Sequence, residues 1–327
     1  MKILVTGAGG FIGSTLVPKL LAQNHHVIAL DCFFFGEDKL PTHDNLTLLK
    51  KDVRDIALED FQGVEAVIDL VAISNDPGGE HFSEATLAIN FEGRVNVATL
   101  AKKAGAKRYI LPSSCSIYGF SEEIVSETSK TNPLTTYARA NECAEHGVLP
   151  LASDDFTVTV IRQSTVYGPS PRMRFDVVVN IMTHAAWAFG NLRLDGDGKQ
   201  YRPLVHVQDT TDVMCLLLNA DPKLINGELY NVGGNACNYQ IWEIADIVSR
   251  QVKAVTGRDV EIIKRGAIDN RSYRANFDKI EKDLGWTPKH SIEDAVHAIV
   301  TQLDNKQLVK TTQSVTLDWY KEINAFA

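Results

Sequence analysis

The sequence predicts an α/β fold in which a doubly wound parallel sheet is followed by a smaller α/β lobe. Two observations lead to this prediction. Through the first half of the chain, short apolar runs alternate with stretches of helical periodicity, and the first run leads directly into a glycine-rich turn. Continuously apolar strands separated by helices are typical of a parallel sheet covered on both faces. A glycine-rich turn after the first strand makes the sheet Rossmann-type.

The elements follow from these runs in order. We expect strands over residues 2–6, 26–30, 46–50, 65–71, 108–111 and 156–162, and helices over residues 11–23, 83–104 and 134–151. After Gly168, proline and glycine cluster and the regular alternation is lost. We therefore expect a dinucleotide-binding domain over residues 1–167 and a substrate lobe over 168–327. Residues 203–233 contain two further strand-like runs that could return in part to the first sheet.

Composition excludes several classes of function. The 327 residues carry a net charge of -8, which argues against nucleic acid or a membrane surface as the main partner. There is no apolar run of about 18 residues that could span a membrane. The five scattered cysteines form no CxxC pair, so we expect a reducing cytoplasm, no disulfide framework and no metal site. The N-terminus runs straight into a strand, and we expect no signal peptide.

The turn after the first strand has the spacing of a dinucleotide loop. Its glycines follow the pattern G-x-x-G-x-x-G, with a strand before and a helix after. The first glycine permits the tight turn, the second lets the backbone approach a pyrophosphate, and the third lets the helix pack against the strand. No Gly-Lys-Ser/Thr follows, which excludes a P-loop. The loop residues expected to bind the dinucleotide are Gly7, Gly10, Phe11, Ile12 and Gly13.

A carboxylate after the second strand selects the cofactor. Asp31 lies 18 residues beyond the last glycine of the loop, where it can accept hydrogen bonds from the adenosine ribose and repel a 2′-phosphate. No Arg or Lys lies in the loop or just after Asp31, so NAD is favoured over NADP. We expect Asp52 and Val53 to meet the adenine edge, although a solvated turn explains them equally well on physics alone. Leu70 and Ala72 are expected to line the same site.

Further motifs follow in a fixed order along nearly the whole chain. They are Thr6–Gly13, Asn90-Phe91-Glu92-Gly93 with Asn96-Val97, Ser113-Ser114-Cys115-Ser116-Ile117-Tyr118-Gly119, Tyr137-Ala138-Arg139-Ala140, Arg162 with Val166-Tyr167-Gly168-Pro169, Arg202-Pro203-Leu204-Val205-His206-Val207, and Leu284-Gly285-Trp286-Thr287-Pro288. Together they resemble the extended short-chain dehydrogenase/reductases, specifically the NAD-dependent nucleotide-sugar epimerases and dehydratases, a group that includes UDP-glucose 4-epimerases. The resemblance implies hydride transfer at a sugar carbon that bears a hydroxyl.

The resemblance also implies catalytic roles. Tyr137 becomes the acid/base, Ser114 its hydroxyl partner on the substrate oxygen, and Asn90 a cofactor contact. A free tyrosine titrates near 10, so it acts as a base near neutral pH only if positive charge stabilises its phenolate. The family supplies that charge from a lysine four residues after the tyrosine, which also holds the nicotinamide ribose. Here that position is Asn141, which can still hydrogen-bond the ribose but carries no charge.

Several interpretations of Asn141 stay open. The oxidised cofactor or another cation assists Tyr137, or the enzyme is slow, or the protein is a catalytically weakened NAD or nucleotide-sugar sensor, or the asparagine is engineered. A second departure concerns the reaction. Family dehydratases carry an Asp-Glu pair directly after the catalytic hydroxyl, and Cys115-Ser116 replaces it here, which argues against dehydration. We expect an NAD-dependent epimerase or dehydrogenase that acts at the fourth sugar carbon, with a nucleotide-sugar ketoreductase as an alternative.

The substrate is expected to be a nucleotide-diphosphate sugar. Arg202 matches the family's diphosphate arginine, and Arg271 is a candidate second clamp, because a guanidinium fork suits phosphate. Arg172, Thr165 and Asn180 are further candidates for substrate contacts. The sequence leaves the nucleotide of this sugar open among UDP, GDP, CDP and dTDP. The resemblance finally implies a homodimer, in which the helices at about residues 83–104 and 134–151 pack as a four-helix bundle.

Overall fold

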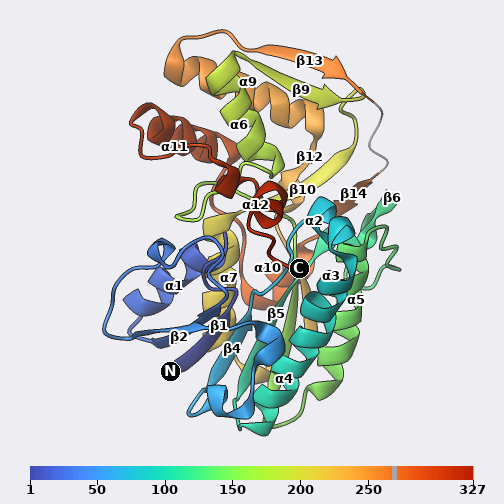
Figure 1. Cartoon of the computed structure of the whole chain (residues 1–327). Coiled ribbons are helices and arrows are strands. Elements are labelled where there is room, and N and C mark those ends of the chain that lie inside the picture. Colours follow the sequence, from blue (N-terminus) through green and yellow to red (C-terminus); the bar gives the residue numbers. More distant parts are fainter. Residues whose placement is uncertain (267–270, 327) are drawn as a thin grey trace.

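A parallel sheet organises the N-terminal part of the computed structural model, which describes residues 1–266 and 271–326 (Figure 1). Within these residues the strand order is β11-β7-β5-β4-β1-β2-β3, and every neighbouring pair is parallel. The strands are β1 (Lys2–Thr6), β2 (His26–Asp31), β3 (Leu46–Lys50), β4 (Ala66–Asp69), β5 (Arg108–Ser114), β7 (Thr157–Gln163) and β11 (Glu228–Val232). The predicted Rossmann-type sheet is confirmed, and each of the six predicted strands belongs to it.

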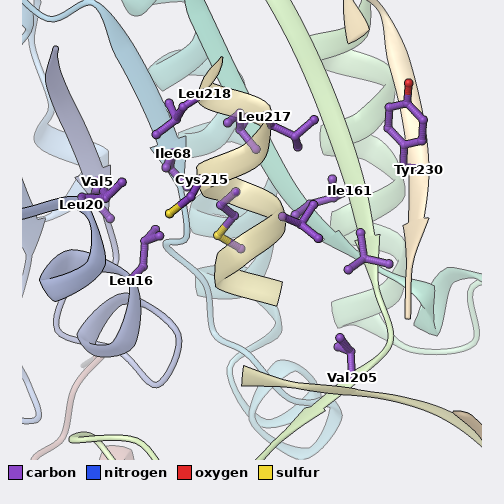
Figure 2. Close-up of a cluster of buried hydrophobic side chains, with 14 of the residues drawn as sticks. Val5, Leu16, Leu20, Ile68, Ile161, Val205, Cys215, Leu217, Leu218 and Tyr230 are labelled. Carbon is purple, nitrogen blue, oxygen red and sulfur yellow. The ribbon is translucent and has the colours of Figure 1, made fainter. Parts of the chain in front are cut away.

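Helices cover both faces of this sheet. On one face lie α1 (Gly13–Ala22) and α7 (Val207–Asn219), and on the other α4 (Arg94–Lys103) and α5 (Thr136–Val148). Figure 2 shows Leu16 and Leu20 of α1 beside Cys215 and Leu218 of α7, against Ile68 of the sheet. These side chains are at most 9 % exposed, and burying a large aliphatic side chain contributes about 1.5–3 kcal/mol. The helices packed on the two faces of the sheet therefore hold its strands, and the site at their carboxyl ends, in place.

The long helix expected over residues 83–104 is interrupted. It consists of α3 (Ser83–Leu87), a π-helical segment (Ala88–Gly93) and α4. Asn90 lies in the π-helical segment, where its buried amide accepts from Ile73 N at 2.9 Å and donates to Ile73 O at 3.0 Å. Short π-helical segments often occur at functional sites. Here the segment aims an asparagine at the loop after β4.

Two elements near the site were not expected from the sequence. The short helix α2 (Asp76–His81) contains a proline and two glycines, so its composition resembles that of a loop, but Asn75 caps it by accepting from Gly78 N at 2.7 Å. The strand β6 (Phe120–Val125) pairs with β14 (Ser272–Ala275), which comes from the far end of the sequence. A pairing this distant has no local signal in the chain.

The second lobe has a core of its own. The helices α6 (Val178–Phe189), α9 (Ile241–Thr256) and α11 (Ile292–Asp304) pack together beside β9 (Asn191–Asp195) and β13 (Glu261–Arg265) (Figure 1). Of the two strand-like runs within 203–233, β11 joins the main sheet, whereas β10 (Tyr201–His206) pairs with β8 (Thr165–Tyr167) and β12 (Asn238–Gln240). The chain therefore crosses back to the first sheet and supplies α7 and β11 to it.

The last part of the chain returns to the junction of the two lobes. After α8 (Pro222–Ile225), α10 (Asp278–Leu284) and α11, the helix α12 (Thr316–Glu322) lies between the lobes (Figure 1). Trp319 of α12 donates from Nε1 to Phe34 O at 2.7 Å, and Tyr320 contacts the rings of Phe34 and Phe35. None of the described helices is long and apolar enough to cross a membrane.

Candidate active site

A large cavity lies between the two lobes, at the carboxyl ends of the parallel strands. Its volume is about 1070 Å³, and residues of both lobes line it. In open α/β sheets, ligands bind outside the carboxyl ends of the strands, where the strand order reverses. In this sheet the order reverses between β1 and β4. The cavity therefore lies where such a sheet binds a dinucleotide.

The glycine loop forms one wall of the cavity, and its geometry requires glycine. A Cβ atom on Gly7, whose φ is +63°, would lie 2.7 Å from the backbone of Leu70, and one on Gly13 would lie 2.5 Å from Gly7 O and Ala8 O. The helix α1 begins at Gly13, and no described side chain caps its N-terminus. Helix N-termini attract phosphate through free N–H groups and the helix dipole. The loop thus fits a pyrophosphate, and all five predicted loop residues line the cavity.

Asp31 is held at the end of β2. Its carboxylate accepts from Gly9 N at 2.9 Å and from Phe33 N at 2.7 Å. Burial raises the pKa of Asp31, while these two backbone hydrogen bonds oppose the rise. Asp52 also lines the cavity, but its carboxylate is engaged by Arg54, whose Nε and Nη2 lie 3.0 and 2.7 Å away. Val53, Leu70 and Ala72 line the same wall, as expected for a cofactor site.

Arg172 lies on the cofactor side of the cavity, although it was expected to contact the substrate. Its backbone N–H donates to Ser14 Oγ at 3.2 Å, and its guanidinium lies 3.6 Å from the ring centre of Phe35. Nη2 donates to Thr316 Oγ1 at 3.0 Å, while the buried Nε has no partner among the described residues. These contacts place the cation of Arg172 beside α1 and the end of β2, and its role toward the substrate stays a prediction.

Tyr137 and Ser114 both line the cavity. Tyr137 is in the first turn of α5, which Thr135 caps by accepting from Ala138 N at 3.1 Å. Ser114 ends β5, and its Oγ accepts from Ser116 N at 3.1 Å. The two predicted catalytic hydroxyls therefore come from separate elements that open on one space. A sugar hydroxyl placed there would meet two protein hydroxyl groups within the same pocket.

Three asparagines expected to contact ligands do not line the cavity of the described chain. The amide of Asn141 donates to Tyr137 O at 2.9 Å and accepts from Arg94 Nη1 at 2.9 Å. Asn180 accepts from Gly168 N at 3.0 Å and donates to Arg174 O at 2.9 Å, while Asn90 binds Ile73 as described above. Buried polar side chains are generally hydrogen-bonded within the protein, and these three amides already have protein partners. Their geometry therefore supports a role in holding the walls of the site rather than direct contact with ligand.

The far end of the cavity carries the expected substrate arginines. Arg202, Arg271 and Thr165 line it. Arg271 forms an ion pair with Asp76 of α2, and Arg202 donates to the carbonyl oxygens of Arg271 and Tyr201. These contacts join β10, the residue before β14, and α2 around one space. A diphosphate entering here would meet two guanidinium groups, which suits its charge.

Some features of the site had no sequence signal. Arg174 and Asp176 form a buried bidentate pair on the cavity wall, with Nε–Oδ1 at 2.8 Å and Nη2–Oδ2 at 3.2 Å. Burial alone would raise the pKa of Asp176, but the charge and hydrogen bonds of Arg174 hold it well below its usual range. Tyr320 and Phe326 also line the cavity from the end of the chain. From the sequence alone, an aromatic residue near a terminus is most simply interpreted as a packing residue.

Comparison with known proteins agrees with this geometry. Residues 3–233 match the model of the NAD dependent epimerase/dehydratase family. The chain belongs to the NAD-dependent epimerase/dehydratase family. The predicted resemblance is therefore confirmed, and so is NAD as the cofactor, because the family is NAD-dependent. The glycine loop and Asp31 line the cavity in which we expect this cofactor to bind.

Relatives within the family have different activities. The chain is 28 % identical over 327 residues to UDP-glucuronic acid decarboxylase 1 of Arabidopsis thaliana, covering 94 % of this chain and 71 % of the relative. It is 28 % identical over 318 residues to UDP-glucose 4-epimerase of Mycolicibacterium smegmatis, covering 94 % and 99 %. The crystal structure of UDP-glucuronic acid 4-epimerase from Bacillus cereus, in complex with UDP-glucuronic acid and NAD, aligns with a TM-score of 0.82 and 25 % identity, covering 93 % and 100 %.

Proposed function

We propose that the protein is an NAD-dependent nucleotide-sugar epimerase or dehydrogenase that oxidises a sugar hydroxyl carbon, the fourth by analogy with its relatives. One observation carries the proposal: Tyr137 and Ser114 line the same cavity as the glycine loop and Asp31. NAD, when bound, supplies the acceptor for a hydride from the sugar carbon. The residues of the chain then have to hold the sugar and manage one proton.

Tyr137 takes the proton of the sugar hydroxyl as its base, and Ser114 orients the oxygen by a hydrogen bond. The proton passes from the sugar oxygen to the phenolate oxygen as the carbon–hydrogen bond breaks, leaving a ketone. In an epimerase Tyr137 returns the proton when hydride is delivered to the other face of the ketone. In a dehydrogenase the proton leaves to solvent. Both reactions need positive charge near Tyr137 to keep its phenol acidic.

Dehydration is disfavoured by the residues after Ser114. Cys115 is fully buried, its thiol lies 3.1 Å from Arg162 O, and burial raises its pKa well above the usual range. It is therefore neither a general acid at neutral pH nor a reactive nucleophile. Ser116, which lines the cavity, is no carboxylate either. The chain has no Asp-Glu pair at this point to remove water across the sugar ring.

The diphosphate of the substrate is proposed to bind at Arg202 and Arg271, with Thr165 beside them. The relatives bind or act on UDP-sugars, including UDP-glucose and UDP-glucuronic acid, so UDP-sugars are the first candidates. The homodimer through the helices at about residues 83–104 and 134–151 stays a prediction, and so does the cytoplasmic location. A catalytically weakened sensor remains the second candidate, because Asn141 replaces the family lysine and does not reach the cavity.

A panel of nucleotide sugars tests the proposal. The protein, supplied with NAD, is incubated with UDP-glucose, UDP-glucuronic acid and their N-acetylated and 6-deoxy analogues, and the products are identified by NMR. We expect an epimer, or a stoichiometric rise in NADH absorbance, with at least one sugar. Tyr137→Phe should abolish the product while retaining NAD. Tight nucleotide-sugar binding without turnover at any pH would instead support the sensor.

A further inference from the structure

We propose that Asp76 is a positioning residue that joins the arginine at the diphosphate end of the cavity to the helix that carries Tyr137. The inference rests on the proposed function, because it concerns how the two ends of one nucleotide sugar are aligned. Asp76 begins α2, and it acts through Arg271 and through Thr135, the residue that caps α5. Binding of the diphosphate and placement of the sugar beside Tyr137 then depend on one carboxylate.

The two oxygens of Asp76 bind partners that come from distant parts of the chain. Oδ1 accepts from Thr135 Oγ1 at 2.7 Å, and Oδ2 forms an ion pair with Nη1 of Arg271. These partners lie 59 and 195 residues further along the sequence. The side chains of Asp76 and Arg271 are 21 % and 40 % exposed, and both residues line the cavity. The carboxylate therefore ties a guanidinium on the cavity wall to the start of α5.

The helix α2 also contacts the two residues of α5 that follow Thr135. Glu80 Oε1 accepts from Thr136 N at 2.5 Å. Gly79 lies against Tyr137, because a Cβ atom at this glycine would be 3.0 Å from Tyr137 Cβ and 3.2 Å from Tyr137 N. Three consecutive residues of α5 thus meet α2. The position of α2 therefore sets the position of the Tyr137 backbone and Cβ, from which the phenol extends.

The second lobe holds the loop that leads into α2. Asn75 Nδ2 donates to Asp176 Oδ2 at 3.0 Å, and Arg174 Nη1 donates to Ser74 Oγ at 3.2 Å. Ser74 and Asn75 line the cavity. The start of α2 is therefore anchored to the second lobe by the pair of Arg174 and Asp176, and separately by Arg271. A helix fixed in this way transmits the position of the second lobe to the start of α5.

The ion pair of Asp76 with Arg271 is expected to add little to the stability of the fold, because both side chains are partly exposed. An arginine side chain has many conformations, and a carboxylate that holds it in one of them lowers the entropy lost when a diphosphate binds. The repulsion between this carboxylate and the diphosphate is screened, because the pair is partly solvated. The binding energy of the remote diphosphate can then align the sugar hydroxyl with Tyr137, where a misplacement of about 1 Å costs up to roughly a hundredfold in rate.

Asp76→Asn tests the inference, because it keeps an oxygen for the Thr135 hydroxyl and removes the charge that faces Arg271. With NAD bound, we expect the affinity for UDP, measured by calorimetry, to fall roughly tenfold. We expect kcat with the nucleotide sugar that the panel identifies to fall by about tenfold as well. Asp246→Asn is the matched control, because it makes the same change in the exposed pair of Asp246 with Arg250 on α9. This control should leave both quantities unchanged.

Two further variants separate the effect on binding from the effect on turnover. Gly79→Ala places a methyl group against Tyr137, so it should lower kcat roughly tenfold and leave UDP affinity within about twofold of the parent. Arg271→Gln removes the guanidinium directly, so UDP affinity should fall roughly tenfold. In the Arg271→Gln protein, Asp76→Asn should lower UDP affinity by less than about twofold further, because the arginine that it positions is already gone. A purely structural role for Asp76 would lower the urea midpoint and leave the two effects on UDP affinity additive.

The possible results separate the inference from the proposed function. A fall in both UDP affinity and kcat for Asp76→Asn, with no further loss of affinity beyond that of Arg271→Gln, supports the inference. Unchanged or tighter UDP binding in Asp76→Asn overturns it, because the carboxylate would then be neutral toward the arginine or would block it. An unchanged kcat or additive losses of affinity also overturn it. If no nucleotide sugar is turned over while the losses of UDP affinity are still non-additive, the proposed reaction is wrong and the link between Asp76 and Arg271 stands.

Discussion

The buried ion pair between Arg162 of β7 and Glu145 of α5 lies beside the end of β5, and its loss should be costly. Arg162 Nε lies 3.1 Å from both carboxylate oxygens of Glu145, and Nη2 lies 2.6 Å from Oε2. Ser113 Oγ donates to the same carboxylate at 2.5 Å, and Arg162 Nη1 donates to Tyr118 OH at 2.9 Å. The two side chains of the pair are 7 % and 1 % exposed. Glu145→Ala therefore leaves a buried guanidinium without its counter-charge.

The expected loss is about 3–5 kcal/mol, the range for removing one partner of a buried pair. The surface pair Arg250–Asp246 is the matched control, because both side chains are more than half exposed, and Asp246→Ala should cost at most about 0.5 kcal/mol. Urea unfolding measures both through the change in midpoint at constant slope. Replacing both partners, Glu145→Leu with Arg162→Met, should recover most of the loss. A cost for Glu145→Ala below about 1 kcal/mol would refute the reasoning.

Three further predictions follow from the cofactor side of the site and from one buried histidine. Asp31→Ser should shift the binding preference from NAD toward NADP by roughly tenfold or more, about 1.4 kcal/mol, because the carboxylate is gone and the cation of Arg172 remains. An equal ratio of NAD to NADP affinity in the variant and the parent would contradict this. Ending the chain after Lys310 removes Tyr320 and Phe326 from the cavity wall and should speed the release of NAD by roughly tenfold. The release rate is measured by fluorescence after dilution, and an unchanged rate would show that α12 does not cover the cofactor. His206 is buried and stacked on His290, and burial lowers its pKa to about 4. Since the unfolded chain takes up this proton near pH 6.5 and the folded one only near 4, stability should fall as the pH drops through that window. His206→Asn should flatten that part of the urea stability profile, and an identical pH dependence would argue against the assignment.

Much of the site could be predicted from the sequence, because its pattern is local. The glycine loop depends on a backbone geometry that requires glycine. The spacing of its glycines therefore predicts the loop directly. Asp31 follows from its position at the end of a strand, and Tyr137 and Ser114 from motifs that resemble a family. All of them line the cavity. These are residues whose role depends mainly on their place in an element.

The remainder depends on contacts that the sequence does not record. The amides of Asn90, Asn141 and Asn180 were expected to face ligands, but each is engaged by a protein group: Ile73, Tyr137 O and Gly168 respectively. Arg94 is buried, although an arginine in an amphipathic helix is normally a solvated charge. Its burial follows from the packing of α4 against α5, which has no local signature. The fold therefore decides which polar side chains serve the ligand and which hold the walls.

The central claim is that this cavity moves a hydride between a sugar carbon and NAD while Tyr137 moves the proton. The most direct measurement uses a nucleotide sugar that the protein turns over, carrying deuterium at the fourth carbon, in ordinary water. The account predicts that the epimer retains the deuterium at that carbon, or that NADH acquires it if the reaction stops at oxidation. Tyr137→Phe should do neither while still holding NAD. Loss of the deuterium to water would contradict the account, because the hydrogen would then have left as a proton.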